Sequence, residues 1–350
     1  MTAHTLDSLI AGAASQPRAL LALARVLLAK GDGMKARELA LRALETADCD
    51  PETFALAGEI MSYGVPDWHF SIVRDEIRNA AYDAALKRAI RPGMRVLDIG
   101  AGTGLLAMMA ARAGAAEVIS CEMNPAVAEA ARNVIAKNGY ADHIRVVTRH
   151  SSDLNVIDDL GGPVDLLVSE IVSNDMLGQA ALPVHEQAAR RLLRSGAQII
   201  PALGIVRVAL AEDRKWNHKR MTEAAGFDLT PFNRLSPRRY SIGVGEERLV
   251  LKSEAADLIL FDFQSSGPFP ERRTEIAVRA GGPGANGVVQ WIALAMDNDG
   301  RYENTPEHGA TSCWAAQFYP FPETFRPVEG ERITIFCAHD RQTLRIWANR

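Results

Sequence analysis

The run Val96-Leu-Asp-Ile-Gly-Ala-Gly-Thr-Gly-Leu-Leu106 constrains the fold more than any other part of the sequence. Hydrophobic residues lead into Asp98, and three glycines at alternate positions (Gly100, Gly102 and Gly104) precede a run typical of a helix. Glycine adopts backbone conformations closed to other residues and lets a ligand approach closely. The first turn of the next helix also offers free N–H groups. The pattern therefore predicts a strand–turn–helix unit that binds a ligand at its turn.

An acidic residue further along the chain narrows the class of ligand. Glu122 ends the next strand-like run, where nucleoside-binding α/β folds place a carboxylate on the ribose hydroxyls. The Asp-x-Gly-x-Gly-x-Gly spacing differs from the Gly-x-Gly-x-x-Gly pattern of dinucleotide enzymes and from a phosphate-binding loop. It resembles the first motif of S-adenosylmethionine-dependent methyltransferases, whose cofactor carries no phosphate. The sequence therefore predicts a nucleoside-containing cofactor, and the resemblance implies S-adenosylmethionine.

Composition argues against several other classes of protein. The 350 residues are 47% hydrophobic and 23% charged, with a net charge of −4, which gives no basic field to attract nucleic acid. The four cysteines form no Cys-x-x-Cys pair and the eight histidines show no metal-ligand spacing. No apolar run is long enough to span a bilayer, and the N-terminus does not resemble a signal peptide. We therefore expect a cytoplasmic protein without a metal, a membrane segment or a nucleic-acid partner.

The pattern of elements divides the chain into three expected domains. Residues 1–63 are predicted to form paired helices that resemble a tetratricopeptide hairpin, with a plain helical extension as the alternative. Residues 64–201 alternate strands and helices, which predicts a doubly wound parallel sheet. Residues 202–350 contain short β-rich runs between turn residues, which predict a sandwich or barrel. The expected fold is thus a helical cap, a Rossmann-like α/β domain and an all-β barrel-like domain.

Individual elements follow from the same patterns. In the α/β domain the expected strands are 96–99, 117–121, 144–148, 164–169 and 198–201, and the expected long helices include 67–82, 125–138 and 175–193. In the β domain the expected strands are 205–210, 248–251, 258–263, 274–280, 288–296, 312–319, 332–339 and 343–347. The stretch 215–232 is expected to be helical or irregular.

An α/β methyltransferase domain followed by a β-barrel resembles the protein arginine methyltransferase family, and the helical cap resembles its branch with tetratricopeptide-like helices. The resemblance covers about residues 66–350. It implies an enzyme that transfers a methyl group from S-adenosylmethionine to a guanidinium nitrogen and releases S-adenosylhomocysteine, without a metal. Members of the family commonly pair through an arm on the barrel, so the resemblance also implies a homodimer.

The resemblance assigns cofactor-binding roles to several residues. Arg78, in Asp75-Glu-Ile-Arg-Asn, matches the arginine that binds the cofactor carboxylate, and a planar guanidinium suits that task. His69 matches a histidine that lines the cofactor cleft, and Ser152 and its neighbours match the adenine-facing segment. The remaining cofactor-binding residues are Asp98, Gly100, Gly102, Gly104 and Glu122.

The segment 168–183 matches the loop in which two glutamates bind the substrate guanidinium. Glu170 fills the first position, but Gln179 stands where the family has the second glutamate, so one charge is lost. Asp175 is a candidate to supply that charge if a helix begins there, because it would share a face with Gln179; the alternative is an acid at a helix start that stabilises the helix dipole. Trp314 matches the tryptophan that walls the arginine channel and stacks on guanidinium. Cys313 replaces a histidine next to it and is expected to be structural.

Three functions follow from these matches and departures. The first is methylation of arginine in proteins, with Glu170 and Gln179 as the catalytic pair. The second is methylation of free L-arginine or another small guanidine. The third, favoured by Gln179 and Cys313, is an S-adenosylmethionine-binding interaction protein with weak or no catalysis.

Overall fold

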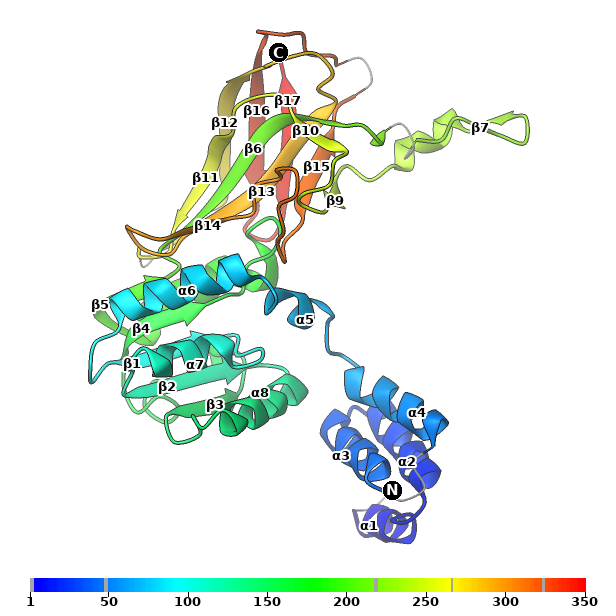
Figure 1. The fold of residues 1–350 in the computed structure, drawn as a ribbon, viewed down its shortest axis with the longest axis vertical. Helices are drawn as coiled ribbons and strands as arrows, with labels where there is room; N and C mark the ends of the chain where they lie inside the picture. The colour runs from blue at the N-terminus through cyan, green and yellow to red at the C-terminus, as the bar shows by residue number, and fades with distance from the viewer. Residues whose placement is uncertain (1–2, 47–49, 217–219, 266, 323–324) are drawn as a thin grey trace.

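Four helices at the N-terminus form a unit with its own hydrophobic core, drawn in blue in Figure 1. They are α1 (Ala3–Gly12), α2 (Pro17–Ala29), α3 (Gly33–Leu44) and α4 (Pro51–Ser62). Asp32 and Asp50 begin α3 and α4 by accepting hydrogen bonds from backbone N–H groups, as preferred N-cap residues do. The computed structural model, which describes residues 3–46, 50–216, 220–265, 267–322 and 325–350, thus confirms a helical cap. Its tetratricopeptide-like character stays a prediction.

The segment before the first strand is broken where the sequence pattern predicted one helix over 67–82. It forms α5 (Trp68–Ile72) and α6 (Glu76–Ala89) instead. Helix α5 ends at Ile72, and Asp75 starts α6, because its carboxylate accepts the backbone N–H of Arg78 at 2.9 Å. The break turns α5 away from α6 and towards the glycine turn at residues 100–104 (Figure 1).

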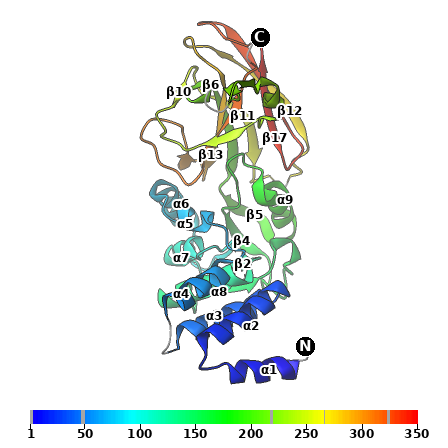
Figure 2. The same cartoon turned by 90° about the vertical axis from the view of Figure 1, so that its right-hand side faces the viewer.

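The α/β domain is a five-stranded parallel sheet in the order β3-β2-β1-β4-β5. Its strands are β1 (Arg95–Ile99), β2 (Glu117–Glu122), β3 (Ile144–Thr148), β4 (Val164–Ser169) and β5 (Leu193–Ile200), and its other helices are α7 (Leu105–Arg112), α8 (Pro125–Lys137) and α9 (Ala181–Arg191). Figure 2 shows α6 and α7 on one side of the sheet and α9 on the other. The predicted doubly wound sheet is confirmed. The helix predicted over 175–193 starts six residues later than expected, at Ala181.

The β domain is antiparallel, and most of its apolar core is continuous with that of the α/β domain, while a smaller cluster lies within the β domain alone. One sheet contains β10-β6-β13-β15-β9, with β11 beside β6 and β14 beside β13; a second contains β12-β16-β17. The strands are β6 (Leu203–Asp213), β9 (Tyr240–Ile242), β10 (Leu249–Leu251), β11 (Ala256–Asp262), β12 (Arg272–Arg279), β13 (Gly287–Ala295), β14 (Arg301–Glu303), β15 (Ala316–Pro320), β16 (Arg332–His339) and β17 (Leu344–Asn349). The predicted all-β, barrel-like domain is confirmed, and the bounds of the three domains stay predictions.

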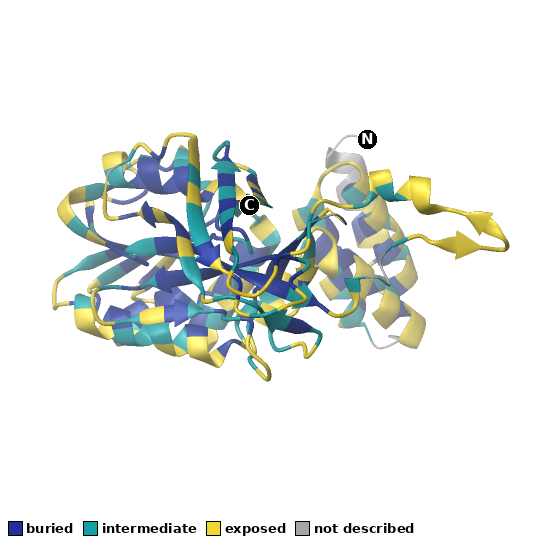
Figure 3. Ribbon diagram, turned by 90° about the horizontal axis from the view of Figure 1, so that it is seen from above, coloured by how far each residue is buried: buried dark blue, intermediate teal, exposed yellow. Residues whose placement is uncertain are grey.

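Residues 220–239, between β6 and β9, project from the β domain as an arm (Figure 1). The arm contains the short hairpin β7 (Glu223–Ala224) and β8 (Phe227–Asp228) and a 3₁₀ turn, η4 (Thr230–Leu235). Figure 3 shows it almost wholly exposed. The described part is therefore a hairpin and a turn, without an α-helix; residues 217–219 of the predicted stretch 215–232 lie outside the described residues.

Polar contacts join the β domain to the α/β domain. The Tyr302 hydroxyl donates to Asp75 at 2.6 Å, and Arg88 binds Asp297 through two hydrogen bonds of 2.8 and 2.9 Å. Asp75 therefore receives one hydrogen bond from its own helix and another from β14, so the break between α5 and α6 is fixed from both domains.

Candidate functional site

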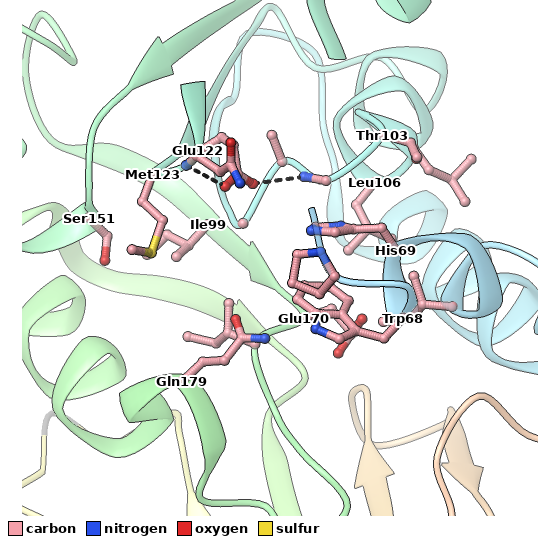
Figure 4. Close-up of a pocket in the computed structure, with 18 of the residues that line it drawn as sticks. Trp68, His69, Ile99, Thr103, Leu106, Glu122, Met123, Ser151, Glu170 and Gln179 are labelled. Atoms are coloured by element: carbon pink, nitrogen blue, oxygen red, sulfur yellow. Dashed lines mark hydrogen bonds between the residues drawn. The ribbon is translucent and has the colours of Figure 1, made fainter. Parts of the chain in front are cut away.

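A cavity of about 620 Å³ lies at the carboxyl ends of β1, β2 and β4 (Figure 4). The order of the sheet reverses here, since β1 lies between β2 and β4. Ligands of open α/β sheets bind at such switch points. Residues from α5, the β1–α7 turn, the end of β2 and the loop after β4 line the cavity together.

The glycine turn forms one wall of the cavity, and its three glycines serve two different purposes. All three have positive φ: 88° at Gly100, 51° at Gly102 and 80° at Gly104. A Cβ on Gly104 would lie 2.9 Å from Ile135, and one on Gly100 would lie 3.0 Å from Ile171, so both serve packing. A Cβ on Gly102 would meet His69 Nδ1 at 3.9 Å and the Gly100 carbonyl oxygen at 4.0 Å, which are ordinary contacts, so Gly102 keeps the cavity open.

Glu122 lies at the edge of the same turn. One carboxylate oxygen accepts the N–H of Gly102 at 3.2 Å and the other accepts the N–H of Asn124 at 2.9 Å (Figure 4). These bonds hold the carboxylate at the cavity wall. It is in the position expected for a partner of ribose hydroxyls.

The floor of the cavity holds a buried ion pair that the sequence pattern did not predict. Arg78 Nη2 lies 3.1 Å from Glu170 Oε2, and both side chains are only 4% exposed. Arg78 also donates to Asn79 at 2.7 Å and lies over the ring of Tyr82, whose hydroxyl binds the carbonyl of Ser169. The residue expected to bind a carboxylate and the residue expected to bind a guanidinium are therefore partners of each other.

Burial sets the electrostatics of this pair. It raises the pKa of the Glu170 carboxyl to about 7, and the Arg78 guanidinium opposes that rise. A carboxylate in a dry site is costly unless a cation neutralises it. When the Glu170 carboxyl is ionised, it therefore strongly favours a positively charged partner.

The other predicted cofactor residues are placed differently. His69 lines the cavity and stacks on Trp68 with ring centroids 3.8 Å apart, and burial lowers its pKa. Asp98 does not line the cavity: it is fully buried below the turn, accepts the Ser120 hydroxyl at 2.7 Å, and burial raises its pKa to about 7. Ser152 lies just outside, bonded to His150, while its neighbour Ser151 forms the lining.

Of the predicted acceptor residues, Glu170 and Gln179 line the cavity. Figure 4 shows Gln179 with its amide directed into the cavity, towards Glu170. Gln179 has a left-handed backbone, with φ 53° and ψ 29°. Such a conformation is uncommon for residues other than glycine and is enriched at functional sites.

The expectations for Asp175 and Trp314 need correction. No helix begins at Asp175, so it does not share a face with Gln179; its carboxylate accepts Arg239 Nη1 at 2.6 Å. Trp314 donates its indole N–H to the carbonyl of Val172 at 3.3 Å and is 5% exposed. Neither side chain lines the cavity, because each instead contacts the junction between the two domains.

Cys313 takes part in the same junction. Its backbone N–H donates to Asp75 Oδ2 at 3.0 Å. Burial raises the pKa of its thiol, which keeps the sulfur protonated. The structural role expected for Cys313 agrees with this environment.

Several lining residues escaped the sequence analysis. Asn124 caps α8 through the N–H of Ala126 and donates its amide to the carbonyl of Gly64, which fixes the segment before α5 to the cavity rim. Met123 and Trp68 line the cavity beside it. The Asn-Pro pair at the start of α8 was a signal for the cap, but nothing local placed Gly64 there.

The described part of the chain contains no cluster of three or more His, Cys, Asp or Glu side chains that could hold a metal ion. No described helix is long and apolar enough to cross a bilayer.

Comparison with known proteins identifies relatives. Residues 84–208 match the family model described as ribosomal protein L11 methyltransferase (PrmA). The arginine N(omega)-methyltransferase of Streptomyces achromogenes subsp. streptozoticus is 36% identical over 305 residues, which cover 86% of this chain and 83% of that protein. Protein arginine N-methyltransferase 7 of Oryza sativa subsp. japonica is 33% identical over 274 residues, but this chain spans only 37% of its length.

Solved structures share the fold. The Trypanosoma brucei PRMT1 enzyme–prozyme heterotetrameric complex with AdoHcy contains a chain that superposes with a TM-score of 0.71 at 22% identity, covering 83% of this chain and all of that one. Arabidopsis thaliana protein arginine methyltransferase 10 gives a TM-score of 0.66 at 16% identity, over 79% of this chain and 95% of that one. Together with the Streptomyces relative, these matches place the chain in the S-adenosylmethionine-dependent arginine N-methyltransferase family.

Proposed function

We propose that the cavity binds S-adenosylmethionine through Arg78 and Glu122 and holds the acceptor guanidinium on Glu170. The buried Arg78–Glu170 pair carries this proposal. Arg78 is a guanidinium that lies opposite Glu170, and Glu170 accepts a hydrogen bond from it. This pairing supports Glu170 as a ligand for a guanidinium and Arg78 as a ligand for a carboxylate.

Further observations support the fit of the cofactor. Arg78 Nε is buried without a hydrogen-bond partner among the described residues, so a carboxylate has a free donor to bind. Gly102 leaves room beside Glu122 for a ribose. S-adenosylmethionine supplies an activated methyl group when bound. The residues of the chain orient the acceptor and exclude water, where proximity contributes most to the rate.

The proposed acceptor is free L-arginine, with methylation at a terminal guanidinium nitrogen. The Streptomyces relative, which matches most of both chains, is named for arginine and not for protein arginine. Protein arginine is the second candidate, because the Oryza sativa protein named protein arginine N-methyltransferase 7 matches over 71% of this chain. The weakly catalytic interaction protein predicted as a third function has less support, since Gln179 still faces Glu170 in the cavity.

One experiment separates the acceptors. The purified chain is incubated with methyl-labelled S-adenosylmethionine and either L-arginine or a glycine- and arginine-rich peptide, and labelled products are quantified. We expect methylated free arginine with a kcat/KM at least about tenfold above that for the peptide. A higher kcat/KM for the peptide assigns the enzyme to protein substrates. If neither L-arginine nor the peptide becomes labelled, the result contradicts the proposed activity.

We also propose a homodimer in which the arm of one copy contacts the other copy. The arm exposes Phe227, Phe232 and Leu235, which are 71%, 60% and 74% exposed. Phe70 on α5 and Ile77 on α6 are each 62% exposed, and they lie on the two helices that precede the sheet of the α/β domain. Exposed apolar side chains of this size are typical of interfaces. A homodimer in which each arm covers the partner's α5–α6 surface buries both.

Sedimentation velocity tests this assembly. The wild-type chain is expected to sediment as a dimer, and the double variant Phe227→Ser/Phe232→Ser as a monomer with unchanged far-UV circular dichroism. The control variant Ile157→Ser removes a 65% exposed apolar side chain elsewhere and is expected to stay dimeric. A wild-type monomer at micromolar concentration contradicts the proposal.

The location of the protein is proposed to be cytoplasmic. Cys121, Cys313 and Cys337 are free thiols, which suits a reducing compartment. Cys49 lies outside the described residues.

A further inference from the structure

The loop that carries Gln179 is held in an uncommon backbone conformation. Between the end of β4 and the start of α9, three residues other than glycine have positive φ: Met176 at 72°, Gln179 at 53° and Ala180 at 55°. Such a conformation is unfavourable for a residue other than glycine and persists only where the surrounding contacts hold it. The contacts that hold this loop therefore decide where the Gln179 side chain points.

An internal contact closes the loop just before Gln179. The Ser173 hydroxyl accepts the N–H of Gly178 at 2.8 Å and donates to Asp175 at 2.6 Å. A Cβ on residue 178 would lie 2.4 Å from the Cβ of Ser173, so only glycine permits this approach. Residues 173 and 178 are thus held close together, and the direction of the loop depends on which group outside it binds Asp175.

The β domain supplies the anchor. Arg239 Nη1 donates to Asp175 Oδ2 at 2.6 Å, and Asp175 is 8% exposed. Nearby, Asn174 accepts hydrogen bonds from Gln290 on β13 at 2.9 Å and from the N–H of Ala315 at 3.0 Å. The bond from Gln290 fixes the backbone of the loop at Asn174, and the bond from Ala315 holds the Asn174 side chain. The Arg239–Asp175 ion pair is the one charged contact described between the loop and the arm.

We propose that Arg239 is a positioning residue for the acceptor: through Asp175 and Ser173 it holds the loop so that Gln179 faces Glu170. Arg239 ends the arm, directly before β9, and it does not line the cavity. Its effect on the guanidinium is therefore indirect. The inference rests on the proposed function, because it requires Gln179 and Glu170 to form the acceptor site.

The test compares Arg239→Gln with Arg238→Gln, which makes the same charge change at the exposed neighbouring residue. Turnover is measured with whichever of L-arginine and the peptide is methylated, and S-adenosylhomocysteine binding is measured by calorimetry. We expect Arg239→Gln to raise the acceptor KM about tenfold, with a cofactor affinity within about twofold of wild type. Arg238→Gln is expected to match the wild type in both.

Three further variants separate positioning from loss of stability. Asp175→Asn is expected to raise the acceptor KM as Arg239→Gln does, and the double variant to raise it no further, because both remove one interaction. Arg239→Lys keeps the charge and is expected to recover part of the affinity. An unchanged acceptor KM in Arg239→Gln, or equal losses of acceptor and cofactor binding, overturns the proposal. An inactive wild-type chain contradicts instead the proposed function.

Discussion

Replacing Glu170 by glutamine is expected to lower methyl transfer by about 10³-fold, the size of effect seen when one electrostatic group is removed from an active site. Glu170 is the only carboxylate among the described residues on the cavity floor, and Gln179 brings no charge to compensate for its loss. The amide of Glu170→Gln retains the shape of the side chain but cannot neutralise a guanidinium. Initial rates with labelled S-adenosylmethionine and arginine measure the loss.

The same variant has an opposite expected effect on the cofactor. Glu170 competes with the cofactor carboxylate for Arg78, so Glu170→Gln is expected to bind S-adenosylhomocysteine as tightly as the wild type or more tightly in calorimetry. Glu76→Gln, an exposed substitution on α6, is the matched control and is expected to change neither quantity. Full turnover by Glu170→Gln refutes the acceptor site.

The pH dependence gives an independent check on Glu170. Its pKa is raised to about 7 by burial, so the carboxyl becomes protonated and neutral as the pH falls below that value. A neutral carboxyl does not pair with a guanidinium. We expect kcat/KM for arginine in the wild-type enzyme to fall about tenfold per unit below pH 7. A flat profile from pH 8 down to pH 5.5 argues against ionised Glu170 as the acceptor ligand.

Replacing Arg78 by methionine is expected to weaken S-adenosylhomocysteine binding by about 10²-fold, the loss expected when one partner of a buried charged hydrogen bond is removed. Arg78 is 4% exposed, and its Nε has no described partner, so a cofactor carboxylate gains a charged donor in a dry site. Calorimetric titration with S-adenosylhomocysteine measures the affinity directly. Arg78→Lys keeps the charge without the planar fork and is expected to lose less.

Controls separate a binding defect from a folding defect. The Arg78→Met variant leaves Glu170 without a cationic partner. Because the pKa of the Glu170 carboxyl is raised, that carboxyl can become neutral near pH 7 instead of remaining a buried charge. Thermal unfolding of each variant shows whether the chain still folds. Arg74→Met, at an exposed position in the α5–α6 connection, is the matched control and is expected to bind S-adenosylhomocysteine normally. Wild-type affinity in folded Arg78→Met contradicts the assignment.

Local patterns predicted most of the α/β domain. The strands 144–148 and 164–169 have the predicted bounds, because short apolar runs between turn residues are enough to define strands of a parallel sheet. The glycine turn was also local: its three residues need positive φ wherever the rest of the chain lies. Departures occur where a single polar residue redirects the chain, as Asp75 does when it starts α6 and breaks the predicted helix.

Contacts across the junction between the two domains could not be predicted from the sequence. Asp175 was expected to serve Gln179 because four residues separate them in a helix, but Arg239, 64 positions away, binds it instead. Trp314 was expected in a channel and instead donates to Val172. Both outcomes depend on how the β domain packs against the loop after β4, and no local sequence pattern specifies that packing.

The sequence by itself determined the cofactor half of this protein, because the Asp98-to-Gly104 turn and Glu122 belong to consecutive strands of the α/β alternation, and consecutive strands are commonly neighbours in a sheet. Only the tertiary structure decided the acceptor half. Arg78 and Glu170 are 92 residues apart and meet because α6 packs above the end of β4. The physical reason is range: backbone conformation follows from neighbours in sequence, whereas the pairing of buried charges follows from the packing of whole elements.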